Sequence, residues 1–398
     1  MNEFNKEAWI TLVDFEKAFD SVEHASLWHV LKKQKVPDHF VKILKTLYKQ
    51  QSAHVRIDVE SRKFPLERGV KQGDPISALL FIAIMQDLCN EVDKKWQNRN
   101  ANGRERLLGI DISNETGRTM TNLRFADDVL LLARSPTDME LMLNDFAEQA
   151  SEYGLKINLG KTKILTQDRN KEVGQQIKVG GAQIEIIAEA ETEKYLGRKL
   201  SFTNNHEQEV RHRIANAWKS FHINKNVLCN RNYNLKDRIR LFEAAVTQTL
   251  LYGCAAWALT KEMKRCLQVE RRKMLIYVFR IFRIKEDEVK ETWETYMQRS
   301  SRKIDEISKQ HGMEDWVTQC LRRKWKFAGK TARQTDKRWS NTILRWKPDG
   351  GRGRQRGRPK TRWEDDISAL AGGDWVEVAK DEQLWEALQE GFITTAFS

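Results

Sequence analysis

The sequence predicts an α+β fold, in which a split βαβ antiparallel sheet with helices on one face precedes a helical domain and a basic C-terminal segment. Up to Asn158 the apolar patterns follow the order strand, helix, strand, strand, helix, strand. Asp127 and Asp128 lie between two apolar β-type arms, which is typical of a tight hairpin. From His206 onward the apolar period is helical. We therefore expect three domains, at residues 1–203, 204–315 and 316–398.

The first elements are a strand and a helix. A β-rich run over residues 8–13 ends at Asp14. Asp20 or Ser21 is then placed to cap a helix that reaches Lys33, because short polar side chains satisfy the free amides at a helix start. The side chains expected on its buried face are Leu27, Val30 and Leu31.

A second helix and a glycine-containing loop follow. The helix begins at Pro37, and its expected apolar stripe comprises Phe40, Ile43, Leu44 and Leu47. Residues 55–59 alternate like a strand, with residues 64–66 as their partner. The loop over residues 68–76 contains glycines that permit close approach of the backbone to a ligand, and Ser77 caps a helix that continues to about Val92.

The hairpin at Asp127 is followed by another helix and strand. Ser135 or Thr137 opens the helix, and Gly154 ends it. Its expected inner side consists of Met139, Met142, Leu143, Phe146 and Ala150. Residues 155–158 then return as a strand. In such a sheet the end of the first strand lies beside the hairpin tip, which would bring Asp14 close to Asp127 and Asp128.

Adjacent carboxylates at a hairpin tip have two interpretations. They raise each other's pKa unless a cation lies between them. A hard divalent ion such as Mg²⁺ removes that cost, because it prefers anionic oxygen ligands. The alternative is an Asp-Asp turn exposed to solvent, and a short motif alone does not decide between the two.

The positive charge is concentrated in one segment. The 398-residue chain has a net charge of +13 and a sequence pI near 9.4. Residues 317–363 contain 16 Lys or Arg and only two acidic residues, whereas the rest of the chain has 53 basic and 54 acidic side chains. This segment predicts a polyanionic partner. Its tryptophans either stack on unpaired bases or pack a small helical unit, with residues 350–360 as a solvated linker; they are Trp325, Trp339, Trp346 and Trp363.

The cysteine pattern and the apolar runs indicate the cellular compartment in which we expect the protein. The five cysteines are scattered and never form a C-x-x-C pair, which argues against a disulfide framework and a zinc knuckle and favours a reducing compartment. There is no signal-peptide pattern, and no apolar run approaches the length of a membrane span. We expect a soluble intracellular protein without a membrane partner, nuclear rather than cytoplasmic because the arginine-rich run can act as a nuclear signal.

Five blocks, in this order, resemble the reverse transcriptase of non-LTR (LINE-type) retrotransposons. They are residues 13–22, 69–77, 125–128, 154–163 and 195–197. Residues 241–260 resemble the helical region that follows in these elements, and residues 357–366 resemble a segment near their C-termini. The resemblance implies a reverse transcriptase palm, a helical thumb-like or connection domain, and RNA-directed extension of a DNA primer on an RNA template from deoxynucleoside triphosphates.

The resemblance also assigns roles to residues. Asp14, Asp127 and Asp128 are the implied catalytic residues. Together with Phe15 they form the implied set for two Mg²⁺ ions, with Mn²⁺ as an alternative. The implied nucleotide-binding residues are Phe19, Gln72, Gly73 and Lys161, and the implied primer-binding residues are Tyr195, Leu196 and Gly197.

Each role has a structural alternative. Phe19 would exclude a ribose 2′-hydroxyl, or it is a core residue that follows a strand. Gln72 and Gly73 would line the nucleotide and the template base, or form an ordinary helix-entry loop. Lys161 would meet the pyrophosphate or donate a proton to it, or is a solvated turn residue. Residues 195–197 would touch the primer backbone, or form a plain β-turn.

The basic segment supplies further candidates for contact with nucleic acid. They are Arg352, Arg354, Arg356, Arg358, Lys360 and Arg362. Residues 356–359 also resemble the core of an AT-hook, in which arginines enter a narrow minor groove.

The chain departs from the family at its start. Only about a dozen residues precede Asp14, which leaves no room for a fingers region, and no endonuclease constellation is visible. We therefore expect a truncated polymerase that extends a primer weakly or not at all. The alternative is a non-catalytic nucleic-acid-binding relic. Two further hypotheses are an RNA-dependent RNA polymerase and a group II intron maturase.

Overall fold

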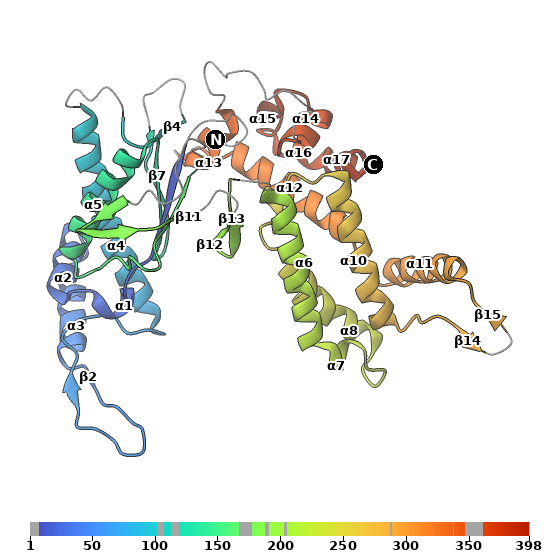
Figure 1. Cartoon of the computed structure of the whole chain (residues 1–398), viewed down its shortest axis with the longest axis horizontal. Helices are drawn as coiled ribbons and strands as arrows, with labels where there is room; N and C mark the ends of the chain where they lie inside the picture. The colour runs from blue at the N-terminus through green and yellow to red at the C-terminus, as the bar shows by residue number, and fades with distance from the viewer. Residues whose placement is uncertain are drawn as a thin grey trace. The chain divides into compact units, whose positions relative to one another are not determined.

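The computed structural model describes residues 8–101, 107–112, 119–166, 177–187, 191–202, 205–286, 289–336, 338–346 and 361–397. The chain divides into two compact units (Figure 1). The first unit ends at Thr203, and most of the chain from Asn204 on forms the second. Each unit has its own hydrophobic core.

A five-stranded sheet organises the first unit. Its strands, in spatial order, are β11 (Ile186–Ile187), β8 (Lys163–Thr166), β1 (Trp9–Val13), β7 (Asp128–Ala133) and β6 (Asn122–Phe125). The central strand β1 is antiparallel to both β7 and β8, whereas β11 is parallel to β8. Val13 pairs with Val129, so Asp14, which follows β1, comes beside Asp128 at the start of β7. This confirms the predicted proximity of the first strand's end and the hairpin.

Helices complete the core of this unit. They are α1 (Ala18–Ser21), α2 (His24–Lys33), α3 (Asp38–Lys49), α4 (Pro75–Ala101) and α5 (Pro136–Ser151). Figure 1 shows α2, α4 and α5 together on one side of the sheet, as predicted. Ser135 caps α5 by accepting a hydrogen bond from the Asp138 amide at 3.1 Å, and all five predicted inner residues of α5 are buried.

Helix α4 is longer than the sequence predicts, since it ends at Ala101 rather than near Val92. Among the described residues, α4 is the one helix that is long enough and apolar enough to cross a membrane, over Pro75–Arg99. Half of that window is buried inside the protein, where Phe81, Ile84 and Leu88 contribute to the core. Leu79 and Ile82 of the same helix are 67% and 50% exposed, so α4 packs one face against the core.

Short two-stranded ribbons lie around the sheet. They are β2 (Ser52–Ala53) with β3 (Phe64–Pro65), β4 (Ile110–Asp111) with β5 (Thr119–Met120), β9 (Ile177–Val179) with β10 (Ala182–Ile184), and β12 (Glu193–Tyr195) with β13 (Arg198–Leu200). The prediction of a strand at residues 55–59 is wrong, because the pairing uses Ser52 and Ala53. Val55, Ile57 and Val59 are exposed instead.

Other predictions near the sheet need correction. Residues 155–158 do not form a strand: Ile157 makes one isolated bridge to Phe15, and the edge strand is β8. Neither Asp20 nor Ser21 caps a helix that reaches Lys33, because α2 begins at His24. The Ser21 hydroxyl donates instead to the carbonyls of Glu16 and Lys17, both at 3.0 Å.

Of the four residues in the predicted apolar stripe of α3, only Leu44 is buried. Phe40, Ile43 and Leu47 are each more than half exposed, whereas Val41, Leu44 and Tyr48 are buried. The buried face is thus rotated by about one residue from the predicted one. Tyr48 explains the rotation, since its ring packs edge-on against His24 and Trp28 of α2.

The second unit is almost entirely helical. Its first part contains α6 (Asn205–Ile223), α7 (Lys225–Leu228), α8 (Leu235–Leu241), the π-helix η2 (Phe242–Thr247), α9 (Gln248–Leu250), the 3₁₀ helix η3 (Cys254–Ala256) and α10 (Lys261–Phe279). A ribbon of β14 (Lys285–Glu286) and β15 (Val289–Lys290) leads to α11 (Trp293–Gln310). The remaining helices are α12 (Trp316–Ala332), α13 (Trp339–Arg345), α14 (Asp365–Ala371), α15 (Trp375–Val378), α16 (Glu382–Ala387) and α17 (Gln389–Phe397).

One hydrophobic core joins these helices, from Val210 to Ala396, and therefore crosses the predicted boundary between residues 315 and 316. Trp325 is 1% exposed, and its ring stacks on Trp385 with centroids 3.7 Å apart. The indole of Trp363 donates to the Ala255 carbonyl at 2.7 Å. The interpretation of Trp325 as a base-stacking residue is therefore wrong, because the core already covers its ring.

Candidate active site

Asp14 is held from both sides by one loop. Its amide donates to the Thr162 hydroxyl at 3.4 Å, and its carbonyl accepts from the Asn158 amide at 2.8 Å. The Thr162 hydroxyl donates in turn to the Asn158 carbonyl at 2.8 Å, and the Thr162 side chain is fully buried. Both residues lie in the block at residues 154–163, but neither has a role implied by the resemblance. The structure shows that they position the backbone of Asp14.

The Asp pair lies where β6 turns into β7. Ala126 and Asp127 form the two-residue turn, and Ala126 adopts a left-handed conformation with φ of 54°. Asp128 already belongs to β7, where it pairs with Phe125. The two carboxylates are therefore on successive residues of a tight hairpin, which allows both to act near one point.

Asp14 and Asp128 open into the same pocket. Its volume is about 390 Å³, and it is lined by Leu12, Val13, Asp14, Asp128, Val129, Gly160, Lys161, Lys163, Glu193, Lys194 and Tyr195. The pocket thus joins two predicted catalytic carboxylates with Lys161 and Tyr195, which come from two further segments of the chain. Lys163, Glu193 and Lys194 were not singled out from the sequence, since no local motif distinguishes them.

The electrostatics of this pocket favour a cation. Partial burial raises the pKa of Asp128, and the charges of Asp127 and Asp14 raise it further. Burial likewise raises the pKa of Tyr195, with a second contribution from Asp128. Lys161 offsets part of this negative charge, because its Nζ lies 3.7 Å from Asp14 Oδ2.

The donor set fits a divalent ion. Asp14 Oδ2 is buried and accepts no hydrogen bond, so it keeps lone pairs available for a ligand. Carboxylate oxygens are the ligands that Mg²⁺ prefers. Among the described residues no three His, Cys, Asp or Glu side chains already converge on one point, so the fit rests on Asp14 and Asp128, with Asp127 adjacent. Phe15 packs its ring 6.0 Å from Phe146 and has only its main chain to offer.

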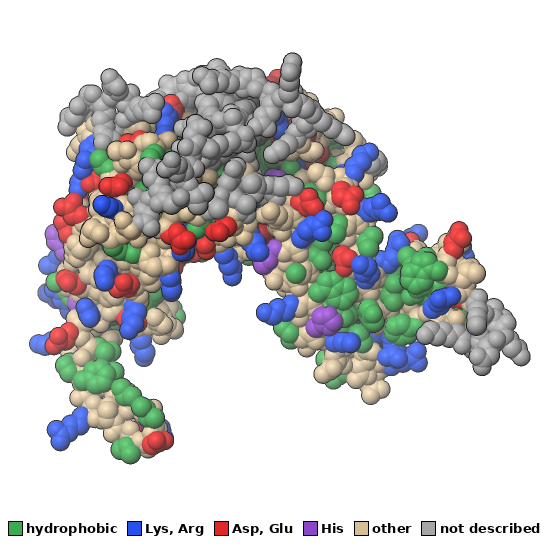
Figure 2. Space-filling model, in the orientation of Figure 1, with side chains coloured by type: hydrophobic (Ala, Val, Ile, Leu, Met, Phe, Trp, Pro, Cys, Tyr) green, Lys and Arg blue, Asp and Glu red, His purple; other side chains and the backbone are tan. Residues whose placement is uncertain are grey.

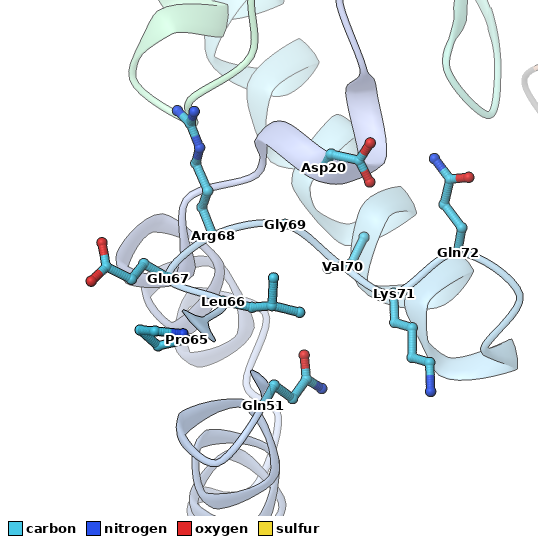
Figure 3. A pocket seen from close by; sticks show the side chains of 10 residues that line it. All are labelled: Asp20, Gln51, Pro65, Leu66, Glu67, Arg68, Gly69, Val70, Lys71 and Gln72. Atoms are coloured by element: carbon cyan, nitrogen blue, oxygen red, sulfur yellow. The ribbon is translucent and has the colours of Figure 1, made fainter. Parts of the chain in front are cut away.

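The predicted nucleotide-binding residues are dispersed. Phe19 stacks on Phe81 of the core with centroids 4.7 Å apart, which agrees with its structural alternative. Gln72 lines a different pocket of about 540 Å³, which the loop before α4 forms together with Asp20, Gln51 and Pro65 (Figure 3). Gly73 follows in that loop with φ of 87°. The structure therefore brings Lys161, but not Gln72, into the pocket of the carboxylates.

Residues 195–197 form the tip of the β12–β13 hairpin. Leu196 and Gly197 both have positive φ, 47° and 74°, as a type I′ turn requires. The turn is thus the β-turn of the structural alternative, and its first residue also lines the carboxylate pocket. A left-handed leucine is unfavourable by itself, which marks this turn as constrained by its surroundings.

Most of the basic candidates lie outside the described residues, namely Arg352, Arg354, Arg356, Arg358 and Lys360. Arg362 is described, and its amide donates to Asp365 Oδ2 at 2.7 Å.

Comparisons with known proteins find reverse transcriptases and proteins of transposable elements. Residues 1–200 match the family described as reverse transcriptase (RNA-dependent DNA polymerase). An uncharacterised transposon-derived protein of Caenorhabditis elegans is 29% identical over 283 residues, covering 68% of this chain and 96% of that protein. The Pol polyprotein of the type-2 retrotransposable element R2DM of Drosophila melanogaster is 31% identical over 206 residues, covering 50% of this chain.

The similarity to solved structures is weaker. The apo telomerase of Candida tropicalis aligns with a TM-score of 0.38 and 10% identity over 98% of this chain. The chain spans 18% of the Drosophila polyprotein and 53% of the telomerase chain.

Proposed function

The chain belongs to the reverse transcriptase family, within the class of non-LTR retrotransposons, and on that premise we propose that its first unit is the catalytic domain of an RNA-directed DNA polymerase. One observation supports the proposal most: Asp14 and Asp128 share a pocket with Lys161 and Tyr195. The partners that the proposal requires are an RNA template, a DNA primer and deoxynucleoside triphosphates. A nuclear location is part of it, because a retrotransposon must reach chromosomal DNA.

Asp14, Asp127 and Asp128 would hold two Mg²⁺ ions, with Mn²⁺ as an alternative. Bound ions supply charge stabilisation for the attacking 3′-oxygen and the leaving pyrophosphate. The chain's own residues prepare this site. Asn158 and Thr162 fix the backbone of Asp14, so that its carboxylate needs little reorganisation.

Two further groups act at the pocket wall. The Lys161 ammonium is largely exposed and only 3.7 Å from Asp14 Oδ2, so it can attract the triphosphate and, at the pyrophosphate oxygen, donate a proton. Tyr195 and the turn after it are placed to touch the primer beside the carboxylates. Phe19 as a selector of deoxyribose, and Gln72 and Gly73 as nucleotide contacts, remain part of the proposal.

Primer extension on an RNA template, with Mg²⁺ and deoxynucleotides, tests this function. We expect Asp127→Asn/Asp128→Asn to lower the rate by at least about 100-fold, because uncharged amides bind Mg²⁺ much more weakly than carboxylates and the ions supply the charge stabilisation. Asp58→Asn is the matched control, since Asp58 is an exposed carboxylate of the same unit.

Three outcomes decide the matter. Extension by the parent and by Asp58→Asn, with none by the double variant, supports the polymerase. Equal extension by all three contradicts the assigned carboxylates. If the parent binds primer–template in a salt-sensitive manner but never extends it, the chain is the non-catalytic nucleic-acid-binding protein.

A further inference from the structure

The second unit carries opposite charges at the two ends of α10. This helix of 19 residues spans about 28 Å. Near its first turn, Lys264 Nζ donates to the Ala396 carbonyl of α17. Just after its last turn, the Arg280 guanidinium donates at 3.1 Å to the carbonyl of Cys229, which ends α7. Figure 1 accordingly shows α14–α17 near one end of α10, and α7 and α8 near the other.

We call the surface beside α7 and α8 the basic end. It comprises residues 221–240 and 277–284, which contain seven Lys or Arg and one acidic residue, Asp237. Asp237 pairs with Arg240 at 3.8 Å. Among the described residues, no carboxylate forms an ion pair with four exposed cations of this end, which are Lys225, Arg231, Lys236 and Arg280. The basic end thus keeps a positive charge that its own side chains do not neutralise.

Exposed apolar side chains lie among these cations. Ile223 is 73% exposed, Tyr277 45% and Phe282 49%. The ring of Tyr277 lies 6.2 Å from that of Phe282 and 6.4 Å from that of Phe221, measured between centroids. Figure 2 shows hydrophobic side chains beside Lys and Arg over the region of α8 and the C-terminal end of α10. Neighbouring exposed apolar side chains of this kind mark a surface that binds another molecule.

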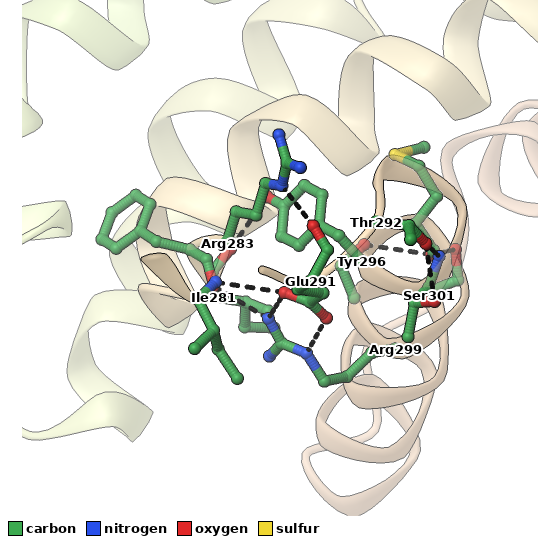
Figure 4. A network of polar contacts seen from close by, with 12 residues as sticks. Ile281, Arg283, Glu291, Thr292, Tyr296, Arg299 and Ser301 are labelled. Atoms are coloured by element: carbon green, nitrogen blue, oxygen red, sulfur yellow. Dashed lines mark hydrogen bonds and ion pairs between the residues drawn. The ribbon is translucent and has the colours of Figure 1, made fainter. Parts of the chain in front are cut away.

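The carboxylate of Glu291 is close to the basic end but is already paired (Figure 4). It accepts from the Arg299 guanidinium at 2.7 and 2.9 Å and from the Ile284 amide at 3.1 Å. The hydrogen bonds of Arg299 lower the pKa of Glu291 to about 2. Arg299 also donates to the Phe282 carbonyl at 2.9 Å. This network holds the segment after α10 in place and leaves the cations of the basic end without a counterion.

The opposite surface, which we call the acidic end, is formed by α14–α17. Residues 364–397 contain nine Asp or Glu and one Lys. Some of these carboxylates are paired, as Glu382 is with Arg333 at 2.8 Å. No cation in the described part of the chain forms an ion pair with four exposed carboxylates of this end, which are Asp365, Asp374, Asp381 and Glu386. Leu384 and Phe397 add apolar surface here, since they are 46% and 39% exposed.

The two ends do not neutralise each other within one molecule. They are separated by the length of α10, about 28 Å, whereas interactions between exposed charges are screened beyond about 8 Å at physiological ionic strength. The dipole of α10 favours carboxylates near its first turn and cations near its last, so it stabilises this separation of charge. Neutralisation of one end by the other therefore requires a second molecule.

We propose that the acidic end of one copy of this chain binds the basic end of a second copy. Each end combines apolar side chains with surrounding charge, as protein interfaces do, and the charges of the two ends are complementary. Because the two surfaces differ, the contact is heterologous. Each added copy leaves one free acidic end and one free basic end, so association continues into a chain or closes into a ring. The contact belongs to the second unit and does not depend on the proposed polymerase activity.

Sedimentation velocity of the nuclease-treated full chain, over about a hundredfold range of concentration, tests the proposal. Arg231→Glu/Lys236→Glu reverses two cations of the basic end. Asp374→Lys/Glu386→Lys reverses two carboxylates of the acidic end. We expect each variant alone to associate at least about tenfold more weakly than the parent, because the reversed side chains repel the charges that they previously attracted.

A mixture of the two variants distinguishes a head-to-tail contact from other modes of association. The first variant keeps an unaltered acidic end, and the second keeps an unaltered basic end. Equal amounts should therefore form a heterodimer with the affinity of the parent, and no larger species, because both ends that remain free are altered. Formation of the heterodimer also shows that both variants are folded.

A control variant makes the same change in net charge at another place. Arg302→Glu/Lys303→Glu reverses two exposed cations of α11 and should associate like the parent. About 0.5 M salt should dissociate the parent, because it shortens the screening length to a few ångström. The proposal is overturned if the parent stays monomeric at low salt, if the control associates as weakly as Arg231→Glu/Lys236→Glu, if the mixture forms no heterodimer, or if larger species appear only with added nucleic acid.

Discussion

At the scale of single residues, the charged carboxylate of Asp128 lowers the stability of the folded protein, although the proposed metal site requires that charge. Its carboxylate is partly buried and faces the charges of Asp127 and Asp14, so its pKa is raised in the folded protein. The unfolded chain releases this proton near the ordinary value of about 3.9. Between the two pKa values the folded state binds more protons than the unfolded state, and stability therefore falls as the pH rises through that window.

We expect Asp128→Asn to stabilise the metal-free protein at pH 7, by less than about 1 kcal/mol because the carboxylate is partly exposed. The advantage should disappear below about pH 3, where the carboxylate is protonated in both states. Mg²⁺ should raise the melting temperature of the parent but not of the variant, because only binding to the folded state stabilises it. Thermal melts in EDTA and in Mg²⁺, with Asp58→Asn alongside, measure this. A less stable variant at pH 7 would contradict it.

At the scale of elements, Gly69 fastens the loop that leads to α4 to the segment between α1 and α2. The Gly69 amide donates to the Val22 carbonyl at 2.7 Å, and its carbonyl lies 2.8 Å from His24 Nε2. Gly69 has φ of 91°, and a Cβ there would meet the Asp20 carbonyl oxygen at 2.8 Å. Gly73 has a similar φ of 87° but no atom within 4 Å of such a Cβ.

These two glycines form a matched pair. Gly69→Ala should lower the free energy of unfolding by about 2 kcal/mol or more, because it adds a backbone clash to the left-handed strain. Gly73→Ala should cost only the strain, about 1 kcal/mol. Urea denaturation of both variants measures the difference. Equal losses would mean that the close approach at Gly69 relaxes without cost.

At the scale of the whole molecule, the basic C-terminal segment is partly internal to the second unit. Lys324 is 2% exposed, and its Nζ donates to both carboxylate oxygens of Asp366, at 2.7 and 2.8 Å. Burial lowers the pKa of Lys324, and Asp366 opposes that shift. The ammonium also lies 5.3 Å from the centre of the Trp363 ring. This contact joins α12 to α14 across part of the chain that sequence composition marks only as positive.

Removing one partner of this pair tests its importance. Asp366→Asn should destabilise the protein by about 3–5 kcal/mol, because it leaves a buried cation unpaired. Asp365→Asn, at the exposed neighbouring position, should cost less than about 1 kcal/mol, because the asparagine side-chain carbonyl can still accept from the Arg362 amide. Chemical denaturation that follows tryptophan fluorescence distinguishes the two. Comparable losses would show that Asp366 contributes as a capping residue rather than as a counterion.

Elements with local signals can be predicted from the sequence. The buried face of α5, from Met139 to Ala150, follows from helical period and from the cap at Ser135. The hairpin at Asp127 follows from two apolar arms and a short turn. The nearness of Asp14 to Asp128 follows once the strand order is assumed. Period and turn chemistry operate within a few residues, so they are visible without a partner.

Contacts between distant segments establish which residues support the site and which faces are buried. Thr162 holds Asp14 across 148 residues of sequence, and nothing local marks that contact. The buried face of α3 differs from the predicted one because Tyr48 packs against Trp28 of α2. Trp325 is a core residue because the ring of Trp385 stacks on it. No local pattern distinguishes Arg238 from other helical arginines, but in the structure carbonyls and other arginines surround its side chain. Burial and pairing depend on distant segments, and chain entropy is overcome only when those segments pack together.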